Sequence, residues 1–123
     1  MEKNRLIDEL QKLLKEKELF NDREALEIQR EIAAIKRIDF SASNKIKIGS
    51  LVLVKDKEAQ RIERYFILPG GSGKVLFRGT KEETIVINPN SPLGSTLIGK
   101  LKGDHCEVKT PRGKRYLTIL SVE

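Results

Sequence analysis

Acidic side chains gather in one short stretch of the sequence, LFNDREALE (residues 19–27), between two segments with helical spacing. Asp22, Glu24 and Glu27 fall within six positions, and carboxylate oxygens are the ligands that hard divalent cations such as Mg²⁺ prefer. The stretch could therefore hold a metal ion. It could also be the turn between two helices, because Asn21 is a good N-cap and Glu24 follows three residues later, as in a capping box. Residue types alone favour the turn.

Two further motifs could carry chemistry. PGGSGKV (residues 69–75) is similar to a phosphate-binding loop, but Leu68 stands where its first glycine should be and Val75 where Ser or Thr should contact magnesium. We predict a flexible loop between strands. His105 and Cys106 are the only residues of their kinds, and neighbours in a strand point to opposite faces. We predict a surface histidine and a buried or half-buried cysteine, and therefore no catalytic residue, metal or cofactor.

Two predicted helices flank the acidic stretch. Apolar residues recur every three or four positions in both segments, which is the period of an amphipathic helix. The pattern predicts helices over residues 4–18 and 22–37, packed antiparallel as a short coiled-coil hairpin. The residues of the two stripes are Leu6, Leu10, Leu13, Ala25, Ile28, Ile32 and Ile35, flanked by Ile7, Leu14, Leu26 and Ala33.

After residue 45 the period changes to that of strands, which we expect at residues 47–54, 61–68, 83–87, 106–109 and 115–122. A short helix should lie between the third and fourth strands, with Pro92 near its first turn and Gly99 just past its end. The predicted class is α+β: an antiparallel sheet of four or five strands with one short helix, preceded by the helical hairpin. We expect a hairpin domain at residues 1–40 and a sheet domain at 41–123.

Charge separates the same two parts of the 123-residue chain. Residues 1–40 carry nine Lys/Arg against ten Asp/Glu, whereas residues 41–123 carry fifteen against eight. A basic second part predicts an acidic partner, either nucleic acid or an acidic protein surface. Aromatic residues are 5% of the chain and Trp is absent, which argues against base-stacking platforms. No apolar run approaches the roughly 20 residues of a membrane span, and we expect a cytoplasmic protein without membrane contact.

Residues 87–123, INPNSPLGSTLIGKLKGDHCEVKTPRGKRYLTILSVE, resemble the C-terminal domain of the bacterial Gre factors (GreA/GreB). The family pattern is a Ser-Pro step, a small-residue helix, Leu-x-Gly-Lys, Gly-Asp, a strand, a Pro-x-Gly turn and a closing strand. Upstream, KIGSLVLVKD and RYFIL resemble the first two strands of that domain. The likeness covers about residues 37–123.

The resemblance implies an FKBP-like fold that docks on bacterial RNA polymerase, at the secondary-channel rim on a coiled coil of the largest catalytic subunit. It implies no prolyl isomerase activity, because fold does not fix function. Carried onto this sequence, the candidate polymerase contacts are Asn90, Ser91, Pro92, Leu93, Gly94, Leu97, Gly99 and Lys100, the last three in part structural.

The first half departs from the family pattern. In full-length Gre factors a long hairpin carries acidic residues down the channel to a second magnesium ion. Here each predicted arm is about 15 residues, or roughly 22 Å, and the resemblance implies arms about twice as long in those factors. Asp22 and Glu24 would fall short of the active centre. A stunted hairpin is similar to that of the regulator of nucleoside diphosphate kinase family.

Three functional hypotheses follow. The first is a non-enzymatic regulator that docks on the polymerase rim, as a monomer or weak dimer, with nucleic acid contacted at most indirectly. The second is a transcript-cleavage factor that works through Asp22 and Glu24 at the hairpin tip. The third is an interaction module whose apolar hairpin pairs with a second copy or another coiled coil.

Overall fold

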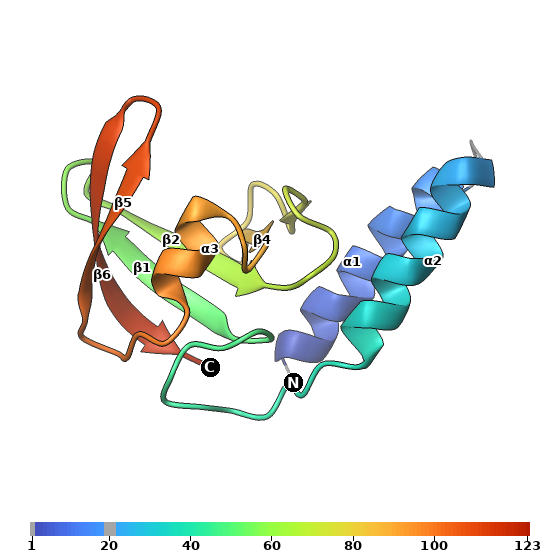
Figure 1. The fold of residues 1–123 in the computed structure, drawn as a ribbon, viewed down its shortest axis with the longest axis horizontal. Helices are drawn as coiled ribbons and strands as arrows, with labels where there is room; N and C mark the ends of the chain where they lie inside the picture. Colours follow the sequence, from blue (N-terminus) through green and yellow to red (C-terminus); the bar gives the residue numbers. More distant parts are fainter. Residues whose placement is uncertain (1, 19–21) are drawn as a thin grey trace.

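The computed structural model describes residues 2–18 and 22–123, with the side chains of residues 2, 17, 18 and 22–25 left out. Figure 1 shows a sheet with a short helix in front of it, and a pair of helices that extends away from one side. No described helix is long and apolar enough to cross a membrane. The predicted α+β class is confirmed.

The helical hairpin consists of α1 (Glu2–Glu18) and α2 (Asp22–Lys36). Their 17 and 15 residues correspond to arms of about 25 and 22 Å at 1.5 Å per residue. The two helices lie side by side (Figure 1), as the apolar spacing predicts. Asn21, the expected N-cap, lies outside the described residues, as do the side chains of Asp22 and Glu24.

The sheet has six strands in the order β3-β4-β2-β1-β6-β5. Along the chain these are β1 (Leu51–Asp56), β2 (Arg61–Ile67), β3 (Val75–Leu76), β4 (Thr84–Ile87), β5 (His105–Thr110) and β6 (Gly113–Val122). The short helix α3 (Pro92–Leu97) joins β4 to β5. β5 and β6 form the hairpin that the Pro111-Arg112-Gly113 turn predicts.

The sheet differs from the prediction in two places. The first strand begins at Leu51 rather than residue 47, because Gly49 adopts φ +95° and residues 47–50 form a turn closed by Ser50 N–H to Lys47 O at 3.0 Å. The sheet is also mixed rather than antiparallel. The unpredicted two-residue β3 lies at the edge, and β4 returns from it between β3 and β2, so that β4 runs parallel to β2.

Apolar side chains form two clusters, because successive residues of a strand point to opposite faces. One cluster joins the hairpin to the sheet: Leu6, Leu10, Leu14, Ile28, Ile32, Ile35, Leu51, Phe66, Leu68, Leu76 and Val86. The other lies between the sheet and α3: Ile46, Val52, Val54, Tyr65, Ile67, Ile87, Leu97, Cys106, Val108, Leu117 and Ile119. Apart from the half-buried Leu13, the described stripe residues of the two long helices are thus buried within their own chain.

Polar and close-packed contacts fix the hairpin on the sheet. Lys3, which is only 7% exposed, donates from Nζ to the carbonyl of Phe40 at 3.1 Å. Arg5 pairs with Glu82 at 3.0 Å and stacks 5.3 Å from the centroid of the Phe77 ring. The PGGSGKV segment is a loop between strands, as predicted, but it is packed rather than free. Its Gly70 and Gly71 are buried against the hairpin.

Candidate functional site

The segment between β4 and β5 (residues 88–100, hereafter the 88–100 segment) contains all eight of the predicted contact residues, and its first half is a tightly bonded turn. Ser91 is the N-cap of α3, and its hydroxyl accepts from the N–H of Gly94 at 3.0 Å. The same hydroxyl donates to the carbonyl of Asn88 at 2.7 Å. The Asn88 side chain accepts from the N–H of Asn90 at 2.8 Å. This network fixes the Ser-Pro step before the helix begins.

Gly94 allows the turn and the helix to approach each other closely. A Cβ atom built on Gly94 would lie far inside van der Waals contact with the carbonyl oxygen of Asn88, and 3.1 Å from the Cα of Pro89. Both neighbours are backbone atoms, which cannot rotate away. Gly94 is buried, so this predicted contact residue shapes the segment instead of presenting a side chain.

The second half of the 88–100 segment is anchored to the chain before β1. Leu97 is fully buried under α3. Gly99, at φ +86°, donates its N–H to the carbonyl of Ile46 at 2.8 Å. The N–H of Ile46 in turn bonds to the carbonyl of Lys100 at 2.9 Å. The helix is therefore held at both ends, although it has only six residues.

The 88–100 segment presents a small, mostly uncharged surface. Asn90, Pro92 and Gly99 are exposed, while Ser91, Leu93 and Lys100 are half-buried. Leu93 packs partly against the core beneath α3. The predicted contact residues thus divide into a surface group around Pro92 and a buried pair, Gly94 and Leu97.

The hairpin tip is the other predicted site. α2 begins at Asp22. The side chains of Asp22 and Glu24 lie outside those that the structure describes, so the predicted tip site has no side-chain geometry to analyse. Elsewhere, within residues 3–16 and 26–123, no three His, Cys, Asp or Glu side chains are grouped so that they could hold a metal ion.

His105 and Cys106 occupy opposite faces of β5, as the sequence predicts. His105 is exposed and its Nδ1 lies 3.0 Å from the hydroxyl of Thr118. Cys106 is 9% exposed in the cluster under α3. Burial raises the pKa of the Cys106 thiol, which disfavours the reactive thiolate. Cys106 is therefore a packing residue.

Sequence reasoning missed a charged cluster at the far end of the α3 face. Arg115 on β6 binds Asp56 at the end of β1, with Nε 2.9 Å from Oδ2, and Glu63 on β2. Glu63 also accepts a hydrogen bond from the hydroxyl of Tyr65. Burial first, and then this hydrogen bond, raise the pKa of Tyr65 to about 12. No sequence signal links residues more than 50 positions apart.

The 88–100 segment and the helical hairpin lie on different sides of the sheet. α3 packs in the cluster that contains Leu97 and Cys106, whereas α1 and α2 pack in the cluster that contains Leu51 and Phe66. Leu51 and Val52 are neighbours on β1 and point to opposite faces. Figure 1 shows the same separation, with α3 in front of the strands and the long helices beyond one edge.

Comparisons with known proteins agree on one family. Residues 41–123 match the model described as "Transcription elongation factor, GreA/GreB, C-term". The GreA of Orientia tsutsugamushi (strain Ikeda) is 31% identical over 117 residues, which cover 91% of this chain and 67% of that relative. The GreA of Cereibacter sphaeroides (strain ATCC 17029 / ATH 2.4.9) is 32% identical over 109 residues, covering 88% and 65%.

Solved structures share the fold. The Gfh1 of Thermus aquaticus superposes with a TM-score of 0.53 at 19% identity, covering 98% of this chain and 86% of the other. The Gfh1 of Thermus thermophilus gives 0.50 at 19% identity, covering 98% and 87%. At this identity the likeness concerns the arrangement of helices and strands.

Proposed function

Because this chain belongs to the GreA/GreB family of transcription elongation factors, we propose that it is a regulator that binds bacterial RNA polymerase. It docks at the rim of the secondary channel, on the largest catalytic subunit, and has no cleavage activity of its own. The contact surface is the exposed part of the 88–100 segment, centred on Asn90, Pro92 and Leu93. Occupying the rim excludes longer-armed factors that need the same place.

The observation that carries this proposal is the hydrogen-bonded, closely packed backbone of the 88–100 segment. Ser91 caps α3 and binds Asn88 at the same time, and Gly94 brings the turn against the helix. A surface whose backbone is already fixed loses little conformational entropy when a partner binds. The turn lies within the part of the chain that matches the family, and an exposed Pro92 beside a half-buried Leu93 offers an apolar contact point.

The length of the hairpin supports docking without cleavage. Arms of 17 and 15 residues reach about 25 and 22 Å. A carboxylate must approach a magnesium ion to about 2 Å in order to bind it. If cleavage factors use arms about twice as long, Asp22 and Glu24 stop about 20 Å short of the metal, a shortfall of the order of one arm's length.

A binding assay with core polymerase tests the docking surface. We expect the parent protein to bind, and Asn90→Arg/Pro92→Glu to lose most of its affinity. Both positions are exposed, and Glu in the first turn of a helix is favoured by the helix dipole, so α3 should remain folded. Ile62→Glu is the matched control, because Ile62 is 60% exposed on β2, away from the 88–100 segment. Absence of binding by the parent would remove the proposal.

A transcript-cleavage assay separates the proposal from the second hypothesis. We expect stalled, backtracked complexes to keep their RNA 3′ ends when this protein is added. Shortened transcripts that disappear with Asp22→Ala/Glu24→Ala would identify the chain as a cleavage factor. The third hypothesis needs a free apolar seam, but the chain itself buries every described stripe residue except the half-buried Leu13. Of the flanking residues, Leu26 is 54% exposed. A concentration-dependent dimer in solution would revive it.

A further inference from the structure

The β5–β6 hairpin projects beyond the rest of the sheet. β1 pairs with β6 only as far as Asp56 opposite Leu117, followed by one hydrogen bond from Lys57 N–H to Tyr116 O at 3.0 Å. The β5–β6 ladder continues to Thr110 opposite Gly113. In the described part of the chain no third strand pairs with residues 109–114, which form a two-stranded ribbon at the end of the molecule away from the long helices (Figure 1).

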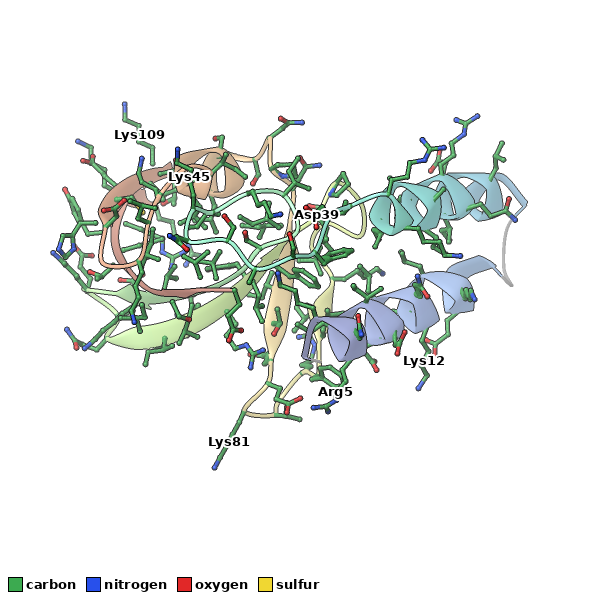
Figure 2. All side chains as sticks on the ribbon, turned by 90° about the horizontal axis from the view of Figure 1, so that it is seen from below. Arg5, Lys12, Asp39, Lys45, Lys81 and Lys109 are labelled. Carbon is green, nitrogen blue, oxygen red and sulfur yellow. The ribbon has the colours of Figure 1, made fainter. Side chains whose placement is uncertain are left out.

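Positive charge is concentrated on this ribbon. Lys109 lies directly opposite Lys114 in the ladder, and Arg112 is in the turn. All three are exposed, as is Lys57 in the neighbouring β1–β2 turn. Figure 2 shows Lys109 pointing away from the body of the protein into solvent. We call these four residues the basic ribbon.

One of the four cations of the basic ribbon, Lys114, has a carboxylate partner, and the other three have none among the described residues. Glu107 pairs with Lys114 at 3.0 Å, and Glu58 is adjacent to Lys57 in sequence. Among the described residues, no carboxylate forms an ion pair with Lys57, Lys109 or Arg112. Like charges directly opposite each other destabilise an antiparallel ladder. The Lys114–Glu107 ion pair offsets part of this repulsion, whereas Lys109 has no ion-pair partner among the described residues.

The base of the ribbon is held firmly. Arg115, next to Lys114, is bound by Asp56 of β1 and Glu63 of β2. Val108 and Leu117 are buried in the cluster under α3. The base of the ribbon is thus fixed by ion pairs on one side and by buried side chains on the other. Binding a ligand therefore requires mainly that the side chains of the cations become ordered.

We propose that the basic ribbon binds the phosphate backbone of duplex DNA. The major groove is wide enough to admit a two-stranded β-ribbon, and a duplex has a dense array of negative charge along its axis. The observations disfavour single strands, because binding them relies on aromatic stacking and Tyr116 is the single aromatic residue on β5 and β6. They also disfavour a protein partner, because protein interfaces have an apolar core and residues 109–114, KTPRGK, offer none.

This contact goes beyond docking on polymerase, since it uses residues outside the 88–100 segment. Phosphate contacts fix position without reading sequence. The basic ribbon would hold the protein on DNA near a transcribing enzyme, with an affinity that depends steeply on salt. Three phosphates neutralised by Lys57, Lys109 and Arg112 predict a slope of about −2.7 in a plot of log K against log salt concentration.

Fluorescence anisotropy with a labelled duplex of random sequence, without polymerase, tests the proposal. We expect Lys109→Gln/Arg112→Gln to weaken binding by at least ~10-fold at about 0.1 M salt and to reduce the slope by about 2. The matched control is Lys12→Gln/Lys15→Gln, which removes the same charge from exposed positions on α1. It should bind DNA like the parent. Far-ultraviolet circular dichroism during heating verifies that each variant is folded.

Several results would overturn the proposal. One is that the parent does not bind duplex DNA at low salt. Another is that the α1 control loses as much affinity as the ribbon variant, because net charge would then explain the binding. Equal or tighter binding of single-stranded RNA or of a polyglutamate peptide would point to a different partner. None of these outcomes involves polymerase, so each is separable from failure of the docking proposal.

Discussion

Replacing Gly94 by alanine is the most direct test of how the 88–100 segment is built. In an ordinary helix this change stabilises by about 1 kcal/mol, because glycine loses more backbone freedom than alanine on folding. Here the added Cβ would overlap the carbonyl oxygen of Asn88 and lie 3.1 Å from the Cα of Pro89. Because both neighbours are backbone, the clash is relieved only if the turn and α3 move apart.

The expected magnitude follows from these two opposing terms. Forcing extra atoms into a packed site costs typically 1–3 kcal/mol, and contact with rigid backbone places this case at about 3 kcal/mol. Subtracting about 1 kcal/mol of helix preference leaves a net destabilisation of about 2 kcal/mol. For a chain of this size that is a fall in Tm of about 8 °C. Displacement of Ser91 and Pro92 should weaken polymerase binding as well.

Urea denaturation of the parent and Gly94→Ala measures the free energy of unfolding. The control is Ser95→Ala on the exposed side of α3, which loses one long hydrogen bond to the carbonyl of Pro92 at 3.3 Å. It should change stability by less than about 0.5 kcal/mol. If Gly94→Ala is as stable as the parent, or more stable, the close approach is not a constraint and the argument for a preformed segment fails.

Three further outcomes are expected. Tyrosinate absorbance should show one phenol that ionises near pH 12, and this transition should be absent in Tyr65→Phe. The stability that the neutral phenol contributes is complete below about pH 10 and is lost as the pH rises through about 12. An ordinary titration of both tyrosines would contradict the charged cluster. Gly71→Ala should lower the free energy of unfolding by about 2 kcal/mol and speed hydrogen exchange in α1. Gly71 has φ +73°, and a Cβ atom there would lie 2.7 Å from Leu10 Cδ1. Unchanged hydrogen exchange would refute the close packing. Lys109→Glu should raise the stability measured by thermal melting by about 0.5 kcal/mol, because it places an opposite charge across from Lys114. The same change should weaken DNA binding. A loss of stability would show that the two lysines do not repel each other.

Local pattern was sufficient for most of the elements. The apolar stripes through Leu10 and Ile32 predicted both long helices to within two residues, because helical period is a property of neighbouring residues. The short helix and the final hairpin followed from Pro92 and from the Pro111-Arg112-Gly113 turn. The alternation of apolar and polar residues predicted the wrong start for the first strand. Ile46 and Ile48 alternate with lysines as in a strand, but Gly49 turns the chain before Leu51.

Apart from the β5–β6 hairpin, the sequence did not predict how the strands pair. β3 has two residues, too few to produce a period, and its place at the edge makes β4 parallel to β2. The buried position of Gly70 and Gly71 against the hairpin could not be read from a glycine-rich loop, which is equally typical of a mobile one.

The amino-acid sequence determined the helices, most of the strands, the basic character of the second half and the likeness to the GreA/GreB family, because each depends on residues that are close together in the chain. Only the tertiary structure decided which of the predicted contact residues are exposed, since burial of Gly94 and Leu97 depends on Asn88 and on the sheet beneath α3. It alone joined Arg115 to Asp56 and Glu63, whereas Lys109 faces Lys114 across the hairpin that the turn predicted. Such contacts depend on strand register, which the buried face of the whole sheet selects.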